Sequence, residues 1–229
     1  MRCHFRKITT TAVLIAAAIP SLVAAEIQVS DLRLSGGFLA RDFRGGATTT
    51  ATDTGGGIST NSESEDGRDA DQNWRGQLQY VAGHLGVGGG FLWGAGVAMN
   101  SASWDNGARE AHVTTPTVNI LLGYGYGITP NWHVELTPFA GYGRAYYSVT
   151  ENSSTETSKE WDSYVEFGAK VATYVALEEH LLLGIEIPYL MGRFDPEYTY
   201  TDETKRRLSV SDKRSNQGFG ALASLGYRF

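Results

Sequence analysis

The segment GFGALASLGYRF, residues 218–229, decides the fold. Alternation of apolar residues with a period of two predicts a β-strand that has one apolar face. An aromatic residue at the very end, Phe229, gains nothing from exposure to water at a frayed terminus. We therefore expect this strand to face an apolar environment. The alternating residues are Phe219, Ala221, Ala223, Leu225, Tyr227 and Phe229.

Seven further segments show the same alternation, whereas apolar residues at helical spacing are almost absent after residue 25. In the first of them, Leu32 and Leu34 share one face, while Arg33 and Arg41 share the other. The sequence therefore predicts eight strands. The seven segments are residues 31–43, 73–83, 90–104, 117–127, 133–147, 161–175 and 181–191.

The links between the eight segments alternate in length. Residues 44–73, 150–160 and 195–215 are long and polar, whereas residues 129–132 and 178–180 are tight turns. Long loops at one end and tight turns at the other indicate an antiparallel up-and-down meander, and eight such strands can close into a barrel.

Two prolines lie inside predicted strands, Pro138 in the fifth and Pro188 in the seventh. Each removes a backbone donor from the ladder. We expect a β-bulge to accommodate each of them.

The first 25 residues have the features of a secretory signal peptide. Basic residues come before an apolar run at residues 12–19, and Val23-Ala24-Ala25 fits a cleavage site. The expected domains are a signal peptide at residues 1–25 and one barrel domain at residues 26–229. Cys3 is the only cysteine, so the mature chain has no disulfide, cysteine metal site or cysteine nucleophile. A net charge of -6 on an exported chain argues against nucleic-acid binding.

The tryptophans indicate which face of the barrel is outside. All five fall at predicted strand ends, where the aromatic girdles of a membrane barrel lie, because indole prefers the interface between hydrocarbon and water. The runs also approach the 9–11 residues that a tilted strand needs to cross a bilayer. We therefore expect the apolar face to contact lipid. The girdle residues are Trp74, Trp104 and Trp161 at the long-loop end, and Trp93 and Trp132 at the tight-turn end.

The opposite face of the strands carries charges among glycines and amides. On the lipid side, each Arg or Lys at mid-membrane would cost roughly 2–4 kcal/mol. Inside a narrow lumen, charges of opposite sign can pair and fill the space as a structural plug. A narrow gated pore is the alternative. The expected lumen network comprises Arg33, Arg41, Arg75, Glu135, Glu166, Lys170, Glu186 and Arg228.

The signal peptide, the eight runs, the loop asymmetry and the terminal strand together resemble the small outer-membrane barrels of Gram-negative bacteria, of the OmpA and OmpX type. The resemblance implies an all-β fold, an eight-stranded antiparallel up-and-down transmembrane β-barrel in the outer membrane. It also implies that Leu225, Tyr227 and Phe229 form the signal that the barrel-assembly machinery recognises. It is unspecific for activity, because one fold hosts many functions.

An enzyme is one alternative function, since membrane barrels of this size can carry lipid hydrolases or acyltransferases. Such a site needs a nucleophile or water with a base in reach. Among the histidines of the mature chain, only His112 is expected near the outer rim, where Asp105 and Asp162 could approach it. The tract KRSNQG has Lys213 where outer-membrane lipid deacylases have a histidine.

The loops are the remaining candidates. Acidic residues at positions 63–71 could hold a divalent cation weakly, but their spacing does not match a calcium loop. The last loop is basic and could meet lipopolysaccharide phosphates or pair with Asp202, Glu203 and Asp212 across a protruding ribbon. Such a ribbon would offer an edge to a partner. The basic residues are Lys205, Arg206, Arg207, Lys213 and Arg214.

The sequence thus predicts a monomeric outer-membrane barrel with a non-catalytic structural or surface-interaction role. We expect no catalytic residue, cofactor or metal. The expected partners are outer-membrane lipids and lipopolysaccharide, the barrel-assembly machinery and an extracellular partner that the sequence does not identify.

Overall fold

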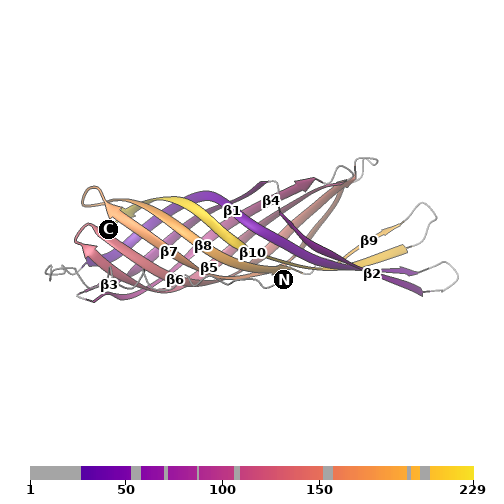
Figure 1. Cartoon of the computed structure of the whole chain (residues 1–229), viewed down its shortest axis with the longest axis horizontal. Coiled ribbons are helices and arrows are strands. Elements are labelled where there is room, and N and C mark those ends of the chain that lie inside the picture. The colour runs from indigo at the N-terminus through magenta and orange to yellow at the C-terminus, as the bar shows by residue number, and fades with distance from the viewer. Residues whose placement is uncertain are drawn as a thin grey trace, which may run out of the picture.

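The computed structural model describes residues 27–52, 58–69, 72–86, 88–105, 109–151, 157–194, 197–201 and 207–229. Within these ranges, no helix is long and apolar enough to cross a membrane. The described chain forms ten strands in one elongated arrangement (Figure 1). The strands are β1 (Ile27–Thr52), β2 (Ile58–Asp69), β3 (Gln72–Leu85), β4 (Gly90–Asp105), β5 (Arg109–Thr129), β6 (Trp132–Glu151), β7 (Thr157–Ala176), β8 (Leu181–Phe194), β9 (Glu197–Thr201) and β10 (Arg207–Arg228).

Eight of these strands close into a barrel because β1 has a partner on each side. Leu34 of β1 lies opposite Leu78 of β3 on one side and opposite Leu225 of β10 on the other. Hydrogen-bonded neighbours follow the order β1, β3, β4, β5, β6, β7, β8 and β10, and β10 then returns to β1. The prediction of an eight-stranded antiparallel up-and-down barrel is confirmed.

The two ends of the barrel differ. At one end, here called the turn end, residues 130–131 and 177–180 join strands directly, and the C-terminus lies there (Figure 1). The link between β3 and β4 is at the same end, where Gly88 and Gly89 both have φ of 93°, a conformation that favours glycine. The opposite end, here called the ribbon end, carries β2 and β9.

At the ribbon end, the two seam strands continue well beyond their neighbours. β1 and β10 stay paired from Asp31 opposite Arg228 to Thr52 opposite Arg207. β2 adds to the free side of β1, and β9 adds to the free side of β10. The result is a four-stranded sheet in the order β2, β1, β10, β9, which projects past the barrel (Figure 1). The predicted ribbon after β8 is therefore confirmed.

The prediction that residues 44–73 form a long polar loop is wrong. Residues 45–52 continue β1, and residues 58–69 form β2. The threonines at 48–50 suit a strand, and β10 provides a paired strand against which the segment can extend. The other long links are also shorter than predicted, because β6 reaches Glu151 and β7 begins at Thr157.

The expected bulges at Pro138 and Pro188 are absent from the described ladders. Pro138 pairs with Ala169 of β7, and the ladder toward β5 is interrupted there but resumes in the same register. Pro188 pairs with Lys170 of β7, and the gap lies on the side of β10. Each backbone N–H of a strand points to one neighbour only, so a proline weakens one ladder and leaves the other intact.

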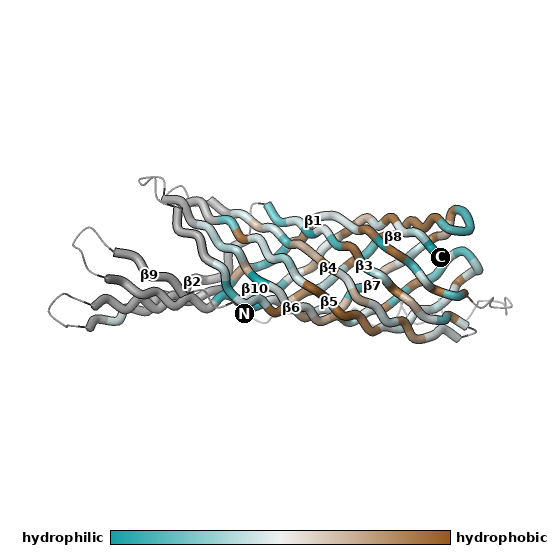
Figure 2. The backbone as a smooth tube through the Cα atoms, turned by 180° about the vertical axis from the view of Figure 1, so that it is seen from behind, coloured by the Kyte–Doolittle hydropathy of each residue, from teal (hydrophilic) through white to brown (hydrophobic). Residues whose placement is uncertain are grey.

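Side chains alternate strictly between the outside and the lumen. Figure 2 shows brown, apolar residues alternating with white and teal residues along the barrel strands. Phe38 and Phe91 are among the most exposed apolar side chains, at 80% and 81%, while Arg33 and Glu186 are fully buried. The barrel thus has an apolar exterior and buries its charged side chains in the lumen, unlike a soluble domain, which exposes them.

Candidate functional site

The lumen holds the predicted charge network. Seven of its eight residues are buried, and Arg228 is partly buried at the turn end. The seven buried residues are Arg33, Arg41, Arg75, Glu135, Glu166, Lys170 and Glu186. Their contacts form layers along the barrel axis.

The layer nearest the turn end is centred on Arg33. Its two terminal nitrogens each donate to one oxygen of Glu135, both at 2.8 Å. Nη2 also donates to Asp31 Oδ2 at 2.8 Å, and Arg228 Nε donates to Asp31 Oδ1 at 2.8 Å. The Arg33 guanidinium lies 4.0 Å from the centre of the Tyr174 ring. This two-pronged geometry is the strongest form of an arginine–carboxylate pair.

Asp31 was not among the predicted site residues, although it is fully buried and pairs with two arginines. The signal was present in the sequence. Asp31 lies two residues before Arg33 and therefore on the same face of the strand.

The next layer is centred on Glu186. Its Oε1 accepts from Ser35 Oγ at 2.6 Å and from Tyr174 Oη at 2.8 Å. Its Oε2 accepts from Gln77 Nε2 at 2.7 Å and from Lys170 Nζ at 3.0 Å. A fully buried carboxylate with four donors is well compensated for the loss of water.

A third layer pairs Arg75 with Glu166. Nη2 donates to Oε1 at 3.0 Å and Nη1 to Oε2 at 3.1 Å. Asn100 Nδ2 and Thr117 Oγ1 donate to the same carboxylate at 3.1 and 3.2 Å. The Phe139 ring lies 5.4 Å from the Arg75 guanidinium.

The layer nearest the ribbon end is centred on Arg41, and its chemistry differs. Arg41 Nε and Nη2 donate to Asn73 Oδ1 at 3.0 and 2.6 Å, and Nη1 lies 3.4 Å from Asn216 Oδ1. Among the described side chains, no carboxylate forms an ion pair with this arginine. Arg41 is thus the one member of the predicted network that amides, rather than a carboxylate, hold in place.

These contacts bridge the lumen from wall to wall. Around the barrel, β6 is four strands from β1 in either direction, and β7 is four strands from β3. Arg33 on β1 therefore reaches Glu135 on the opposite wall, and Arg75 on β3 reaches Glu166 on the opposite wall. Lys170 on β7 likewise donates to Gln79 on β3 at 2.6 Å. Polar side chains cross the lumen at several levels along its length.

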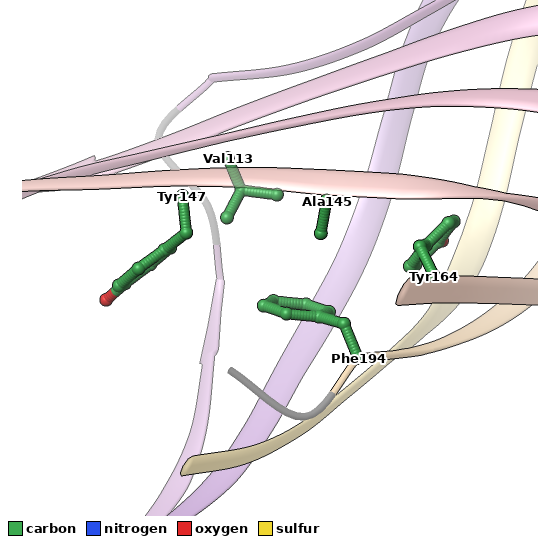
Figure 3. Close-up of a cluster of buried hydrophobic side chains, with 5 residues drawn as sticks. All are labelled: Val113, Ala145, Tyr147, Tyr164 and Phe194. Carbon is green, nitrogen blue, oxygen red and sulfur yellow. The ribbon is translucent and has the colours of Figure 1, made fainter. Parts of the chain in front are cut away.

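Apolar side chains fill the remaining lumen, in addition to the predicted charges. Buried clusters lie at the turn end, at mid-barrel and at the ribbon end. Figure 3 shows the cluster at the ribbon end, where side chains from four strands share one space. Each occupies an inward position in the two-residue alternation, so a positional signal existed. The five residues are Val113, Ala145, Tyr147, Tyr164 and Phe194.

On the outer surface, the predicted girdle tryptophans face away from the lumen. Trp74 and Trp161 lie toward the ribbon end, and Trp93 and Trp132 toward the turn end. All four are exposed on the barrel wall, and Trp132 Nε1 donates to Thr173 Oγ1 at 2.7 Å. Trp104 belongs to β4, but its side chain lies outside the described part.

The terminal strand carries its predicted apolar residues outward. Leu225, Tyr227 and Phe229 are exposed, and the Tyr227 and Phe229 rings lie 5.2 Å apart. His180 stacks on Tyr227 at 5.3 Å, and Phe229 N donates to Ser30 O at 2.9 Å. These contacts tie the last residue to the seam with β1. Recognition by the assembly machinery stays a prediction.

The structure does not bring the predicted catalytic candidates together. His112 is exposed, with Nε2 at 3.1 Å from Thr114 Oγ1 and 3.4 Å from Ser101 Oγ. Asp162 is on β7, two strands away from β5, and it points toward the lumen side. The side chain of Asp105 lies outside the described part.

The loop candidates fall largely outside the described side chains. Positions 63–69 belong to β2 without described side chains, and Asp71 is not described. The side chains of four basic residues of the last loop are likewise not described: Lys205, Arg206, Arg207 and Lys213. The guanidinium of the fifth, Arg214, lies 4.8 Å from the centre of the Tyr147 ring. Within the described residues, no group of three or more histidine, cysteine or acidic residues could hold a metal ion.

A closed barrel with an apolar wall and a charged, packed lumen defines the class of membrane-spanning β-barrels. Neither a protein-family model nor a curated protein matches this sequence. The fold is a closed, eight-stranded, antiparallel up-and-down β-barrel.

Three solved structures illustrate the likeness. The outer membrane protein OprG from Pseudomonas aeruginosa is 16% identical with a TM-score of 0.38, over 89% of this chain and 97% of that chain. Ail, the attachment invasion locus protein of Yersinia pestis, is 12% identical with a TM-score of 0.32, over 88% of this chain and 99% of that chain. The outer membrane protease OmpT from Escherichia coli is 9% identical with a TM-score of 0.35, over 88% of this chain and 97% of that chain. At these identities and TM-scores, the likeness says nothing about the function of this chain.

Proposed function

We propose that this protein is a non-catalytic barrel of the outer membrane that acts at the cell surface through the four-stranded sheet at its ribbon end. In this arrangement the turn end faces the periplasm and the ribbon end faces outward. Outer-membrane lipids and lipopolysaccharide surround the wall, and the barrel inserts as a monomer by way of the barrel-assembly machinery.

The observation that carries this proposal is the contrast between the two parts of the molecule. The lumen is bridged by ion pairs between opposite walls and packed with aromatic side chains, which suits a scaffold. The sheet at the ribbon end is built by the same seam strands, and its outer strands β2 and β9 each have one side without a partner strand among the described elements. Free strand edges are a known means of binding extended chains.

The rival functions are a narrow gated pore and a lipid-modifying enzyme. Planar-bilayer recording on refolded protein tests the pore. Discrete conductance steps that change in the Glu186→Gln variant would overturn the scaffold role, because Glu186 accepts four hydrogen bonds in the middle of the lumen. Incubation with lipopolysaccharide followed by mass analysis tests the enzyme. A deacylated or acylated product that His112→Ala abolishes would overturn the non-catalytic role.

The surface role is tested with a variant that lacks most of the sheet. Gly46 lies opposite Ser64, and Phe194 lies opposite Arg214, so short turns can replace residues 47–63 and 195–213 without disturbing the barrel registers. We expect wild-type protein in lipid nanodiscs to bind at least one member of an array of host glycans and matrix proteins, and the trimmed variant to bind none. Equal binding by both proteins would contradict the proposal.

A further inference from the structure

We propose that Arg41, Asn73 and Asn216 hold a small monovalent anion, of which chloride is the simplest example, inside the lumen near the ribbon end. This site is independent of the surface role proposed above. It rests on charge, on unpaired donors and on burial.

The first argument is charge. Each of the four other cations of the predicted network, Arg33, Arg75, Lys170 and Arg228, forms an ion pair with a carboxylate. Arg41 is only 3% exposed, yet its described partners are two amide oxygens, the Tyr164 hydroxyl and the Phe43 ring at 5.2 Å, none of which is a carboxylate. Amide oxygens solvate a guanidinium without neutralising it, and an unneutralised buried charge is costly.

The second argument is the surplus of donors around this charge. Asn73 and Asn216 are 6% and 2% exposed, and the Nδ2 atom of each is buried without an acceptor among the described residues. Neither amide can be turned round to use its nitrogen, because the oxygen of each already faces Arg41. Two amide nitrogens that need acceptors therefore adjoin a cation that needs a negative charge.

The third argument concerns the size and kind of the ligand. A water molecule would accept from the amides but would leave the charge of Arg41 uncompensated. A large polyanion would not fit, because Tyr164 beside Asn216 belongs to the buried cluster that packs the lumen toward the ribbon end (Figure 3). A small monovalent anion satisfies both needs, because it accepts from the amide nitrogens and also neutralises the charge of Arg41.

Chloride-35 NMR on the barrel in nanodiscs tests the site, because exchange with a protein-bound ion broadens the chloride line. We expect broadening beyond that of empty nanodiscs, and we expect bromide to reverse it by competition. In Arg41→Gln the excess broadening should disappear. Arg44→Gln is the matched control, since Arg44 lies on the same strand but is exposed and paired with Asp42 at 2.8 Å. The Arg44→Gln variant should retain the excess broadening of the chloride line.

A second variant keeps the test valid if Arg41→Gln misfolds. Asn73→Asp places a carboxylate where Arg41 already donates two hydrogen bonds, so it supplies the missing charge from within. This variant should fold, as judged by heat-modifiable migration on gels, and should no longer broaden the chloride line. Crystals of wild-type protein soaked in bromide should show an anomalous peak beside Arg41. No peak, or equal broadening in wild type, Asn73→Asp and Arg44→Gln, would overturn the anion site.

Discussion

Arg33 and Glu135 join opposite walls of the barrel through two hydrogen bonds of 2.8 Å between fully buried side chains. Loss of one partner from such a pair leaves a buried charge with too little compensation. We expect Glu135→Gln to lower the free energy of unfolding in lipid vesicles by about 3–5 kcal/mol, measured by urea titration. The control is Asp42→Asn, which breaks the exposed pair with Arg44 and should cost less than about 1 kcal/mol. Equal losses in the two variants would show that the bridge adds nothing to stability.

Inward glycines make room for large lumen side chains, and Gly184 gives a direct test. A Cβ at this position would lie 2.5 Å from Cε1 of Tyr174, closer than real contacts allow. The ring would have to leave the Arg33 guanidinium and the Glu186 carboxylate. We expect Gly184→Ala to destabilise the barrel by about 1–3 kcal/mol in the same titration. Gly86→Ala, where an added Cβ meets nothing within 4 Å, should leave stability unchanged.

The terminal phenylalanine is expected to act in assembly more than in stability. Phe229 is exposed on the wall, so its removal opens no cavity in the lumen. We expect Phe229→Ala to reduce the amount of barrel in the outer membrane of cells, while refolding of the purified chain in detergent proceeds as in wild type. Phe91→Ala removes another exposed aromatic at the turn end and should assemble normally. Equal losses of Phe229→Ala and Phe91→Ala barrels from the outer membrane would exclude an assembly signal at Phe229.

The tryptophans offer a test of orientation across the bilayer. Single-tryptophan variants that keep only Trp93 or only Trp161 place one indole at each end of the barrel wall. With lipids brominated at different depths, we expect bromines near the headgroups to quench the tryptophan fluorescence of both variants most strongly, because indole prefers the interface between hydrocarbon and water. Maximal quenching from bromines at the bilayer centre would contradict the girdle prediction.

Much of this fold could be read from local pattern. The strand period assigns every residue to a face, so the charges of the lumen could be placed on one side before any pairing was known. The seam could also be anticipated, since a meander that closes into a barrel must pair its first strand with its last. What fails is the assumption that polar sequence means a loop. β2 forms because β1 and β10 already present a paired strand beyond the wall, which local composition does not reveal.

The partners within the lumen could not be predicted, because they depend on the stagger between distant strands. Asn73 and Asn216 are ordinary amides in the sequence, and only the closed barrel brings both to Arg41. For the same reason, the sequence does not identify Tyr174 and Phe139 as partners of arginines. Eight strands leave a space that must be filled, and flat rings fill it while lying against guanidinium groups.

The length of β1 has a mechanical consequence. A strand of 26 residues is about 85 Å long, far more than a tilted strand needs to cross the bilayer. Because β1 and β10 are paired without interruption from Asp31 to Thr52, a pull on the four-stranded sheet runs along the strands and loads their hydrogen bonds in shear. Bonds loaded in shear share the force and must yield together, whereas bonds that are unzipped yield one by one. The closing seam is therefore also the part of the barrel best placed to withstand a pull on the sheet at the ribbon end.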